Sequence, residues 1–167
     1  MYQLDQTDLK ILRLLQEDCR LTTKELAARV NLSSTPVYDR IKRLEREGFV
    51  KKYVAILDYD KLNRGFSVFC NIRLKQLNAA IAAEFTSSVL AIPEVIECYN
   101  ISGDFDYLLK IQAHDMKHYQ HLLINVLGKL DSIGGIHSIF VMDSVKQQYD
   151  VNYVENRINN PNIEYYI

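Results

Sequence analysis

The stretch "SSTPVYDRIKRLEREG", residues 33–48, decides what kind of protein this sequence encodes. Val37, Ile41 and Leu44 recur at helical spacing, so the stretch predicts a helix with one buried stripe. The opposite face is polar and largely basic, and it carries Thr35, Tyr38, Asp39, Lys42, Arg43 and Arg46. Such a face is either an ordinary solvated surface or a surface that binds an acidic partner, and the flanking sequence has to distinguish the two.

Two shorter helices are predicted before this stretch. In "LDQTDLKILRLLQED", residues 4–18, leucine and isoleucine recur at helical spacing. In "LTTKELAARV", residues 21–30, Thr22 and Glu25 form the pattern of a capping box, in which each residue bonds the backbone of the other. The first 50 residues therefore predict three helices.

The connection between the second and third helices is the tetrapeptide "NLSS", residues 31–34. Asn31 can adopt the left-handed conformation that ends a helix, and Leu32 can fill the core. Ser33 or Ser34 can cap the helix that follows. So short a turn between two helices predicts a helix-turn-helix.

A helix-turn-helix with a basic second helix indicates a DNA-binding domain. Short hydrogen-bonding groups lie near the start of that helix, where base edges would be met, and cationic groups lie further along, where phosphates would run. Lys51 and Lys52 extend the positive strip. The candidate DNA-contacting residues are Ser34, Thr35, Pro36, Tyr38, Asp39, Lys42, Arg43 and Arg46.

The distribution of charge agrees with a basic module at one end of the chain. The formal net charge is -1, but residues 1–52 carry 11 Lys+Arg against 8 Asp+Glu, a net of +3, and residues 53–167 carry 9 against 13, a net of -4. No stretch has the roughly 18 uncharged apolar residues of a membrane helix, and the N-terminus lacks the apolar core of a signal peptide. We therefore expect a cytoplasmic protein that does not enter a membrane.

Neither a disulfide framework nor a metal site is expected. The three cysteines are odd in number and far apart, with no C-x-x-C spacing. His114, His118 and His121 could share one side of a helix and hold a metal, but no nearby thiolate completes a shell, and a solvated face is favoured. The chain predicts no cofactor.

The second half of the sequence predicts an α+β domain. Its elements are a strand at 66–75, a helix at 78–92, strands at 94–101 and 106–113, a helix at 115–130 and, after Gly134 and Gly135, a strand at 136–145. The order βαββαβ is that of a ferredoxin-like sheet with helices on one face. A second copy of the chain is the simplest cover for the other face.

The stretch "SGDFDYLLK", residues 102–110, is the candidate for chemistry in this domain. Gly103 lets the backbone approach a ligand, and Asp104 or Asp106 can accept hydrogen bonds from an ammonium group. The alternative is a plain hairpin whose aspartates bond their own backbone. Asp104 and Asp106 could in principle also act as a catalytic acid and base. Nothing else in the sequence supports catalysis, because it has no nucleophile motif, phosphate-binding glycine loop or metal signature. We expect no enzyme.

Taken together, "LDQTDLKILRLLQED", "LSSTPVYDRIKRLEREGFV" and "SGDFDYLLK" resemble the Lrp/AsnC (feast/famine) family of bacterial transcriptional regulators, from about Leu4 to Val145. The resemblance implies an N-terminal, winged-helix-like helix-turn-helix joined to a ligand-sensing and oligomerising α/β domain. It assigns an effector role to Ser102, Gly103, Asp104, Asp106 and Tyr107. The pocket would be completed near Gly135, Ile136 and His137 of a neighbouring protomer.

The sequence thus predicts a helix-turn-helix domain at 1–52, a linker at 53–64, a sensing domain at 65–145 and an extension at 146–167. The linker contains a strand-like run at 53–57 that could pair with another protomer. The expected function is a sequence-specific transcriptional regulator that binds double-stranded DNA, responds to an amino acid and forms homodimers, tetramers or octamers. The alternatives are an architectural DNA-binding protein and an enzyme similar to siroheme decarboxylases, whose fold looks similar to that of this family.

Overall fold

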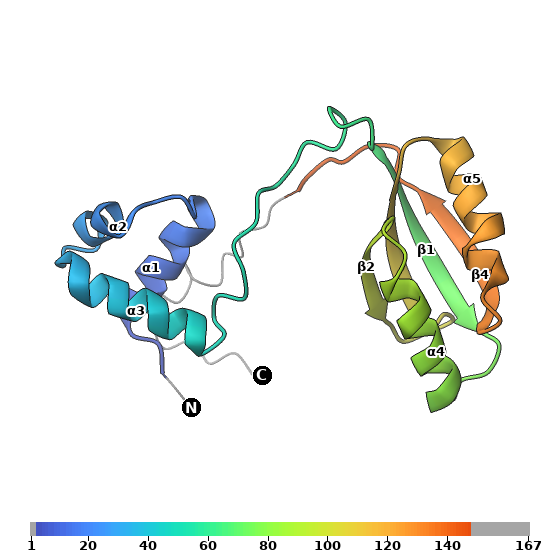
Figure 1. The fold of residues 1–167 in the computed structure, drawn as a ribbon, viewed down its shortest axis with the longest axis horizontal. Helices are drawn as coiled ribbons and strands as arrows, with labels where there is room; N and C mark the ends of the chain where they lie inside the picture. The colour runs from blue at the N-terminus through green and yellow to red at the C-terminus, as the bar shows by residue number, and fades with distance from the viewer. Residues whose placement is uncertain (1–2, 148–167) are drawn as a thin grey trace. The chain divides into compact units, whose positions relative to one another are not determined.

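The computed structural model of the chain describes residues 3–147. Two compact units are present (Figure 1): one contains the described residues up to Ala55, and the other is Ile56–Val145. No helix in the described part is both long and apolar enough to cross a membrane. The predicted extension lies, from residue 148 onward, outside the described residues.

The first unit is the three-helix domain that the sequence predicts. Its helices are α1 (Gln6–Glu17), α2 (Thr23–Arg29) and α3 (Ser34–Arg46). Their apolar faces meet in one core of buried residues: Ile11, Leu15, Leu26, Ala27, Val37, Ile41 and Leu44. The stripe predicted on α3 is therefore confirmed, and burial of this stripe fixes which face of α3 remains exposed.

The turn between α2 and α3 confirms one prediction and corrects another. Asn31 has a φ of 57°, the left-handed conformation expected at the end of α2. Leu32 does not fill the core, because its side chain is 40% exposed. The backbone N–H of Leu32 instead bonds the carbonyl of Ala27 at 3.0 Å, so the turn closes through main-chain atoms. Ser33 occupies the cap position of α3 but makes no side-chain capping bond.

Within the described residues that follow α3, no strand forms before β1, so neither a wing nor the strand-like run at 53–57 appears as a paired strand. Tyr53, Val54, Ile56 and Leu57 are exposed. A strand needs a partner for its backbone groups, and none of residues 3–147 pairs with this run. Pairing with another protomer stays a prediction.

The second unit is a ferredoxin-like domain. Its elements are β1 (Phe66–Leu74), α4 (Ala79–Leu90), β2 (Val95–Asn100), β3 (Tyr107–Ala113), α5 (Met116–Asn125), the short 3-10 helix η1 (Leu127–Lys129) and β4 (Ile133–Phe140). The sheet has the order β2-β3-β1-β4, and every neighbouring pair is antiparallel. This order confirms the predicted topology and places the β2–β3 turn beside the end of β1.

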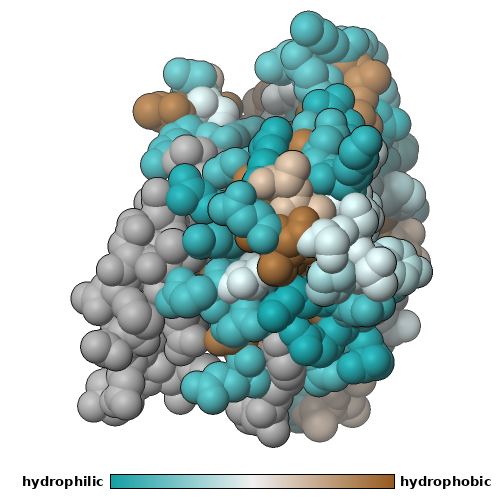
Figure 2. Space-filling model, turned by 90° about the vertical axis from the view of Figure 1, so that its left-hand side faces the viewer, coloured by the Kyte–Doolittle hydropathy of each residue, from teal (hydrophilic) through white to brown (hydrophobic). Residues whose placement is uncertain are grey.

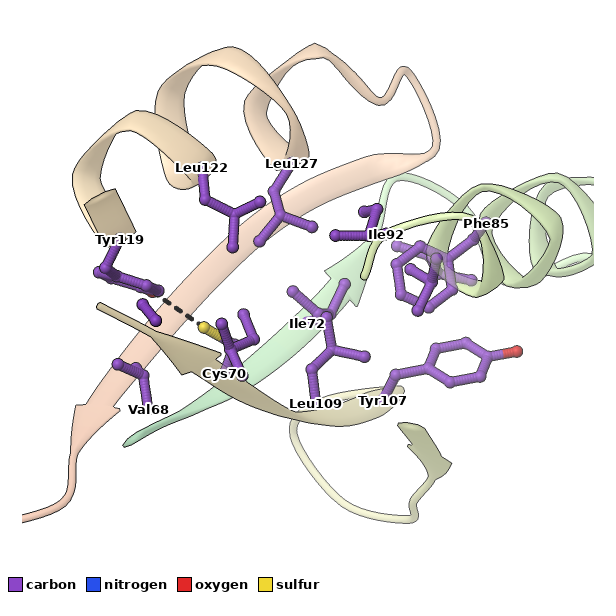
Figure 3. Close-up of a cluster of buried hydrophobic side chains, with 14 residues drawn as sticks. Val68, Cys70, Ile72, Phe85, Ile92, Tyr107, Leu109, Tyr119, Leu122 and Leu127 are labelled. Atoms are coloured by element: carbon purple, nitrogen blue, oxygen red, sulfur yellow. Dashed lines mark hydrogen bonds between the residues drawn. The ribbon is translucent and has the colours of Figure 1, made fainter. Parts of the chain in front are cut away.

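Both helices cover the same face of this sheet. Phe85 from α4 and Tyr119 and Leu122 from α5 pack on the inward side chains of β1 and β3 (Figure 3). A polar contact lies within this core, where the Tyr119 hydroxyl is 2.9 Å from the Cys70 sulfur and 2.5 Å from the Ser138 hydroxyl. The opposite face of the sheet carries no helix and exposes Tyr99 and Ile139.

The last strand begins earlier than the sequence predicts. β4 starts at Ile133 and ends at Phe140, so Gly134 and Gly135 lie within the strand and not before it. A Cβ at Gly134 would lie 3.0 Å from the carbonyl oxygen of Leu74, where the pairing of β1 and β4 shifts register. Gly134 therefore allows close approach of two backbones within the sheet, whereas the sequence pattern placed it before the strand.

Candidate DNA-binding surface and effector site

The exposed face of α3 carries nearly all of the predicted DNA-contacting residues. Seven of the eight are exposed to solvent: Ser34, Thr35, Pro36, Tyr38, Asp39, Lys42 and Arg46. Figure 2, which views the molecule from the left-hand side of Figure 1, shows a mostly hydrophilic surface with a few apolar residues. Because α1 and α2 pack on the buried stripe, this face is the one that α3 can present to a partner.

The two outward cations of α3, Lys42 and Arg46, each pair with a neighbouring carboxylate of the same helix end. The Lys42 ammonium is 2.7 Å from the Glu45 carboxylate, and the Arg46 guanidinium is 3.4 Å from that of Glu47. The hydrogen bond from Lys42 lowers the pKa of Glu45, so both groups of that pair are charged at neutral pH. Exposed pairs of this kind contribute little to stability, so a phosphate can replace the carboxylate at small cost.

The Arg43 side chain does not lie on this exposed face of α3. Its guanidinium points toward α1 and contacts the carboxylate of Asp8 at 3.2 Å. Arg40 reaches the same carboxylate at 2.6 Å and Asp5 at 2.5 Å. The Asp8 side chain is completely buried. These four residues, Asp5, Asp8, Arg40 and Arg43, are called the Asp8 cluster below.

Sequence reasoning missed the Asp8 cluster. The sequence pattern assigned no role to Asp8 or to Arg40. The available signal was the spacing of two arginines, Arg40 and Arg43, three residues apart beside the buried stripe of α3. Burial works to lower the pKa of Arg40, but its hydrogen bonds to Asp5 and Asp8 outweigh that effect and raise it, so Arg40 keeps its charge.

The turn between β2 and β3 separates the two aspartates that the sequence grouped together. The carboxylate of Asp106 accepts the backbone N–H of Leu74 at 2.7 Å, and the backbone N–H of Asp106 donates to Ile72 at 2.9 Å. Asp104 is exposed, and only its carbonyl is held, by two N–H groups of Arg73 at 2.8 and 3.1 Å. Gly103 has a φ of +117°, which residues with a side chain rarely adopt.

Aromatic and cationic groups surround this turn. The ring of Phe105 lies between the guanidinium of Arg73, 5.2 Å from its centroid, and the ring of His137, 5.9 Å away and nearly parallel. Within one chain, β4 thus brings His137 to the turn, with Gly135 opposite Arg73 on β1. Of the other predicted effector residues, Ser102 is exposed and Ile136 is half-buried. The Tyr107 side chain is buried against Phe85, so it supports the core and not a pocket wall.

The three histidines do not gather into a metal site. His118 contacts the Glu94 carboxylate at 3.3 Å, and His114 contacts the carbonyl of Asn63 at 2.7 Å. Over residues 3–147, no group of three or more His, Cys, Asp or Glu side chains is arranged to hold a metal ion. His114 and His118 therefore have structural contacts of their own.

A helix-turn-helix with an exposed polar and cationic second helix, followed by a ferredoxin-like α/β domain, defines a two-domain transcriptional regulator. Comparison with known families agrees: residues 4–51 match the winged helix-turn-helix DNA-binding domain, and residues 67–151 match the Lrp/AsnC ligand binding domain. The chain belongs to the Lrp/AsnC family.

Individual relatives resemble the chain over most of its length. The Bkd operon transcriptional regulator of Pseudomonas aeruginosa is 39% identical over 145 residues, covering 87% of this chain and 95% of that protein. The leucine-responsive regulatory protein of Escherichia coli K12 is 40% identical over 144 residues, covering 86% and 88%. A Neisseria meningitidis transcriptional regulator, solved as a complex with L-Met, has a TM-score of 0.85 and 35% identity, covering 89% of this chain and 96% of that one.

Proposed function

We propose that this protein is a transcriptional regulator that binds specific double-stranded DNA sequences through α3 and changes its binding when an amino acid occupies the turn at 102–106. The observation that carries the proposal is the exposed face of α3, with hydroxyl groups in its first turns and cations at its end. A recognition helix places its N-terminal residues against base edges, while cations along the backbone neutralise phosphates.

The roles of the α3 residues follow from their positions. We assign base contacts to Thr35, Tyr38 and Asp39, with Ser34 and Pro36 shaping the start of the helix against the DNA. Lys42 and Arg46 contact phosphates, since theirs are the most exposed cationic side chains of α3. Arg43, which the sequence grouped with them, belongs to the Asp8 cluster in the structure. A chromosomal partner also agrees with the cytoplasmic location that the sequence predicts.

The amino-acid effector is supported by the turn and by two relatives. Asp104 offers an exposed carboxylate for an ammonium group, and Gly103 leaves the adjacent backbone accessible. The names of relatives include a leucine-responsive regulatory protein, and one solved relative is a complex with L-Met. We propose that the ammonium binds Asp104 and that Ser102 and His137 line the same site.

A homodimer is the smallest assembly that fits this proposal. The helix-free face of the sheet exposes Tyr99 and Ile139 and carries the half-buried Phe69 and Leu108 beside them. A second copy would cover these side chains and would place two recognition helices on one DNA molecule. Tetramers or octamers would then arise by further contacts between dimers.

The experiment that tests this function is selection of bound sequences from a random duplex library, followed by competition at physiological salt. The proposal predicts an enriched, imperfectly palindromic sequence that outcompetes random duplex by at least a thousandfold, as is usual for specific binders. Equal competition by selected and random DNA would contradict sequence-specific regulation and would indicate an architectural protein.

A further inference from the structure

The Asp8 cluster balances its own charge. Two carboxylates, Asp5 and Asp8, face two guanidinium groups, Arg40 and Arg43, between α1 and α3. Arg40 bridges both acids, and Arg43 contacts the Asp8 carboxylate. Although two of the four cations on α3 lie in this cluster, the cluster as a whole contributes no net charge to the surface of the domain.

Asp8 cannot easily release these arginines. Its carboxylate also accepts the backbone N–H of Asp5 at 3.2 Å, while the Asp5 carboxylate accepts the N–H of Asp8 at 2.8 Å. This capping box fixes the first turn of α1. If the Asp8 side chain turned outward, the capping box would break and the charge of Arg40 would lose its buried partner. The Asp8 carboxylate is therefore held both by the backbone of α1 and by the arginines of α3.

The two other cations of α3 differ in exposure. Side chains of Lys42 and Arg46 are 54% and 72% exposed, whereas those of Arg40 and Arg43 are 25% and 33% exposed. An exposed cation can exchange a carboxylate for a phosphate, but an arginine bound to a buried carboxylate would have to leave an unmatched charge behind.

We infer that Asp8 is a positioning residue, which keeps the charges of Arg40 and Arg43 away from DNA phosphates and so limits the affinity for DNA. This inference rests on the DNA binding by α3 proposed above. Phosphate contacts strengthen binding to every sequence and carry no sequence information. By withholding two of them, Asp8 lowers the affinity of the domain for DNA of any sequence and leaves fewer contacts that do not depend on sequence.

The test is Asp8→Asn, which keeps the shape of the side chain but removes its charge. Binding to a random-sequence 40-base-pair duplex is titrated by fluorescence anisotropy at several salt concentrations. We expect tighter binding to this duplex and a log–log salt slope steeper by about 0.9 for each arginine that reaches a phosphate, up to about two units. If Asp8 has only a structural role, Asp8→Asn should bind the duplex more weakly than the wild type or with an unchanged salt slope.

The matched control is Glu17→Gln on the same helix, which changes the net charge equally but removes only an exposed pair with Arg13. We expect its salt slope to stay close to that of the wild type. If folded Asp8→Asn gives the same slope as Glu17→Gln, the inference is overturned while DNA binding stands. If the wild type itself shows no salt-dependent binding to the duplex, the proposed function fails first.

A second measurement on the wild type decides the question even if Asp8→Asn does not fold. Phenylglyoxal modifies accessible guanidinium groups, and mass spectrometry reads the extent at each arginine. DNA should protect Arg46, whereas Arg40 and Arg43 should react slowly and at the same rate with or without DNA. Protection of Arg40 and Arg43 equal to that of Arg46 would overturn the inference.

Discussion

The carboxylate of Asp106 accepts the backbone N–H of Leu74 at 2.7 Å and so ties the β2–β3 turn to the end of β1. The pairing of β1 with β4 shifts register between Arg73 and Leu74, so this N–H needs a partner outside the regular ladder. Asp106 supplies that partner. Asp104, two residues earlier, keeps an exposed carboxylate. One aspartate holds the turn and the other is available to a ligand.

This division predicts opposite effects on stability. Asp106→Ala leaves the Leu74 N–H without its acceptor and should lower the free energy of unfolding by about 1–3 kcal/mol. Asp104→Ala removes an exposed side chain and should change it by less than about 0.5 kcal/mol. Urea unfolding of both variants and the wild type measures the difference. Equal losses in the two variants would contradict the assignment of roles.

The face of α3 predicts two classes of DNA-binding variant. Arg46→Ala should weaken binding to all sequences and flatten the salt slope by about one unit, because it removes one phosphate contact. Thr35→Ala should instead alter which base is preferred at one position of the selected sequence. Repeating the selection and the salt titration with each variant checks both. A variant of Thr35 with unchanged preference would remove that residue from the base-reading set.

Burial of the Cys70 thiol predicts a loss of stability at high pH. Burial raises the pKa of the Cys70 thiol above its ordinary value of 9.0. Below that value the thiol is protonated in both folded and unfolded chains, so it has no effect on pH dependence. Above it the unfolded chain releases the proton first, and the free energy of unfolding should fall as pH rises beyond about 9.

Cys70→Ala is the variant that isolates this effect. It should be less stable at neutral pH, because it leaves a small cavity and removes the bond to Tyr119, but part of the decline between pH 9 and 11 should disappear. Thermal unfolding followed by circular dichroism over this pH range gives the comparison. The same decline in both proteins would show that other groups cause it.

Assembly can be tested by placing a charge on the helix-free face of the sheet. Ile139 is exposed on this face in the single chain, so Ile139→Glu should not disturb folding of the protomer but should weaken a dimer formed there. Light scattering at micromolar concentration should give a dimer or larger species for the wild type and a smaller species for the variant. A monomeric wild type would contradict the proposed assembly.

Most of the fold could be predicted because the relevant signals are local. The stripe of Val37, Ile41 and Leu44 and the strand at 66–75 follow from spacing along the chain. The errors arose where long-range contacts decide the structure. The sequence pattern placed Gly134 before the last strand, but it lies in β4, since its missing side chain lets β1 approach.

The candidate sites show the same limit. Sequence position grouped Asp104 with Asp106, but only the fold reveals that Leu74, 32 residues away, bonds one of them. Likewise, helical spacing placed Arg43 beside the exposed cations, and its contact with Asp8 depends on how α1 crosses α3. A pattern along one helix identifies a face, but it does not show which charged groups of that face meet a neighbouring helix.

We propose that an amino acid bound at the β2–β3 turn changes DNA binding by α3. A ligand shifts binding only if it prefers one state of the protein over another. Calorimetric screening of the common amino acids against the wild type identifies the ligand. Asp104→Ala should then lose roughly 1.5–3 kcal/mol of ligand affinity, as expected for a hydrogen bond to a charged group.

The most direct measurement is an anisotropy titration of the selected duplex with and without that amino acid, using wild type and Asp104→Ala in parallel. The account predicts that the ligand changes the wild-type affinity for the duplex, that Asp104→Ala binds ligand-free duplex within a few-fold of wild type, and that its response requires roughly ten to a hundred times more ligand. The account is contradicted if no amino acid alters wild-type binding, or if Asp104→Ala responds at the same ligand concentration as the wild type.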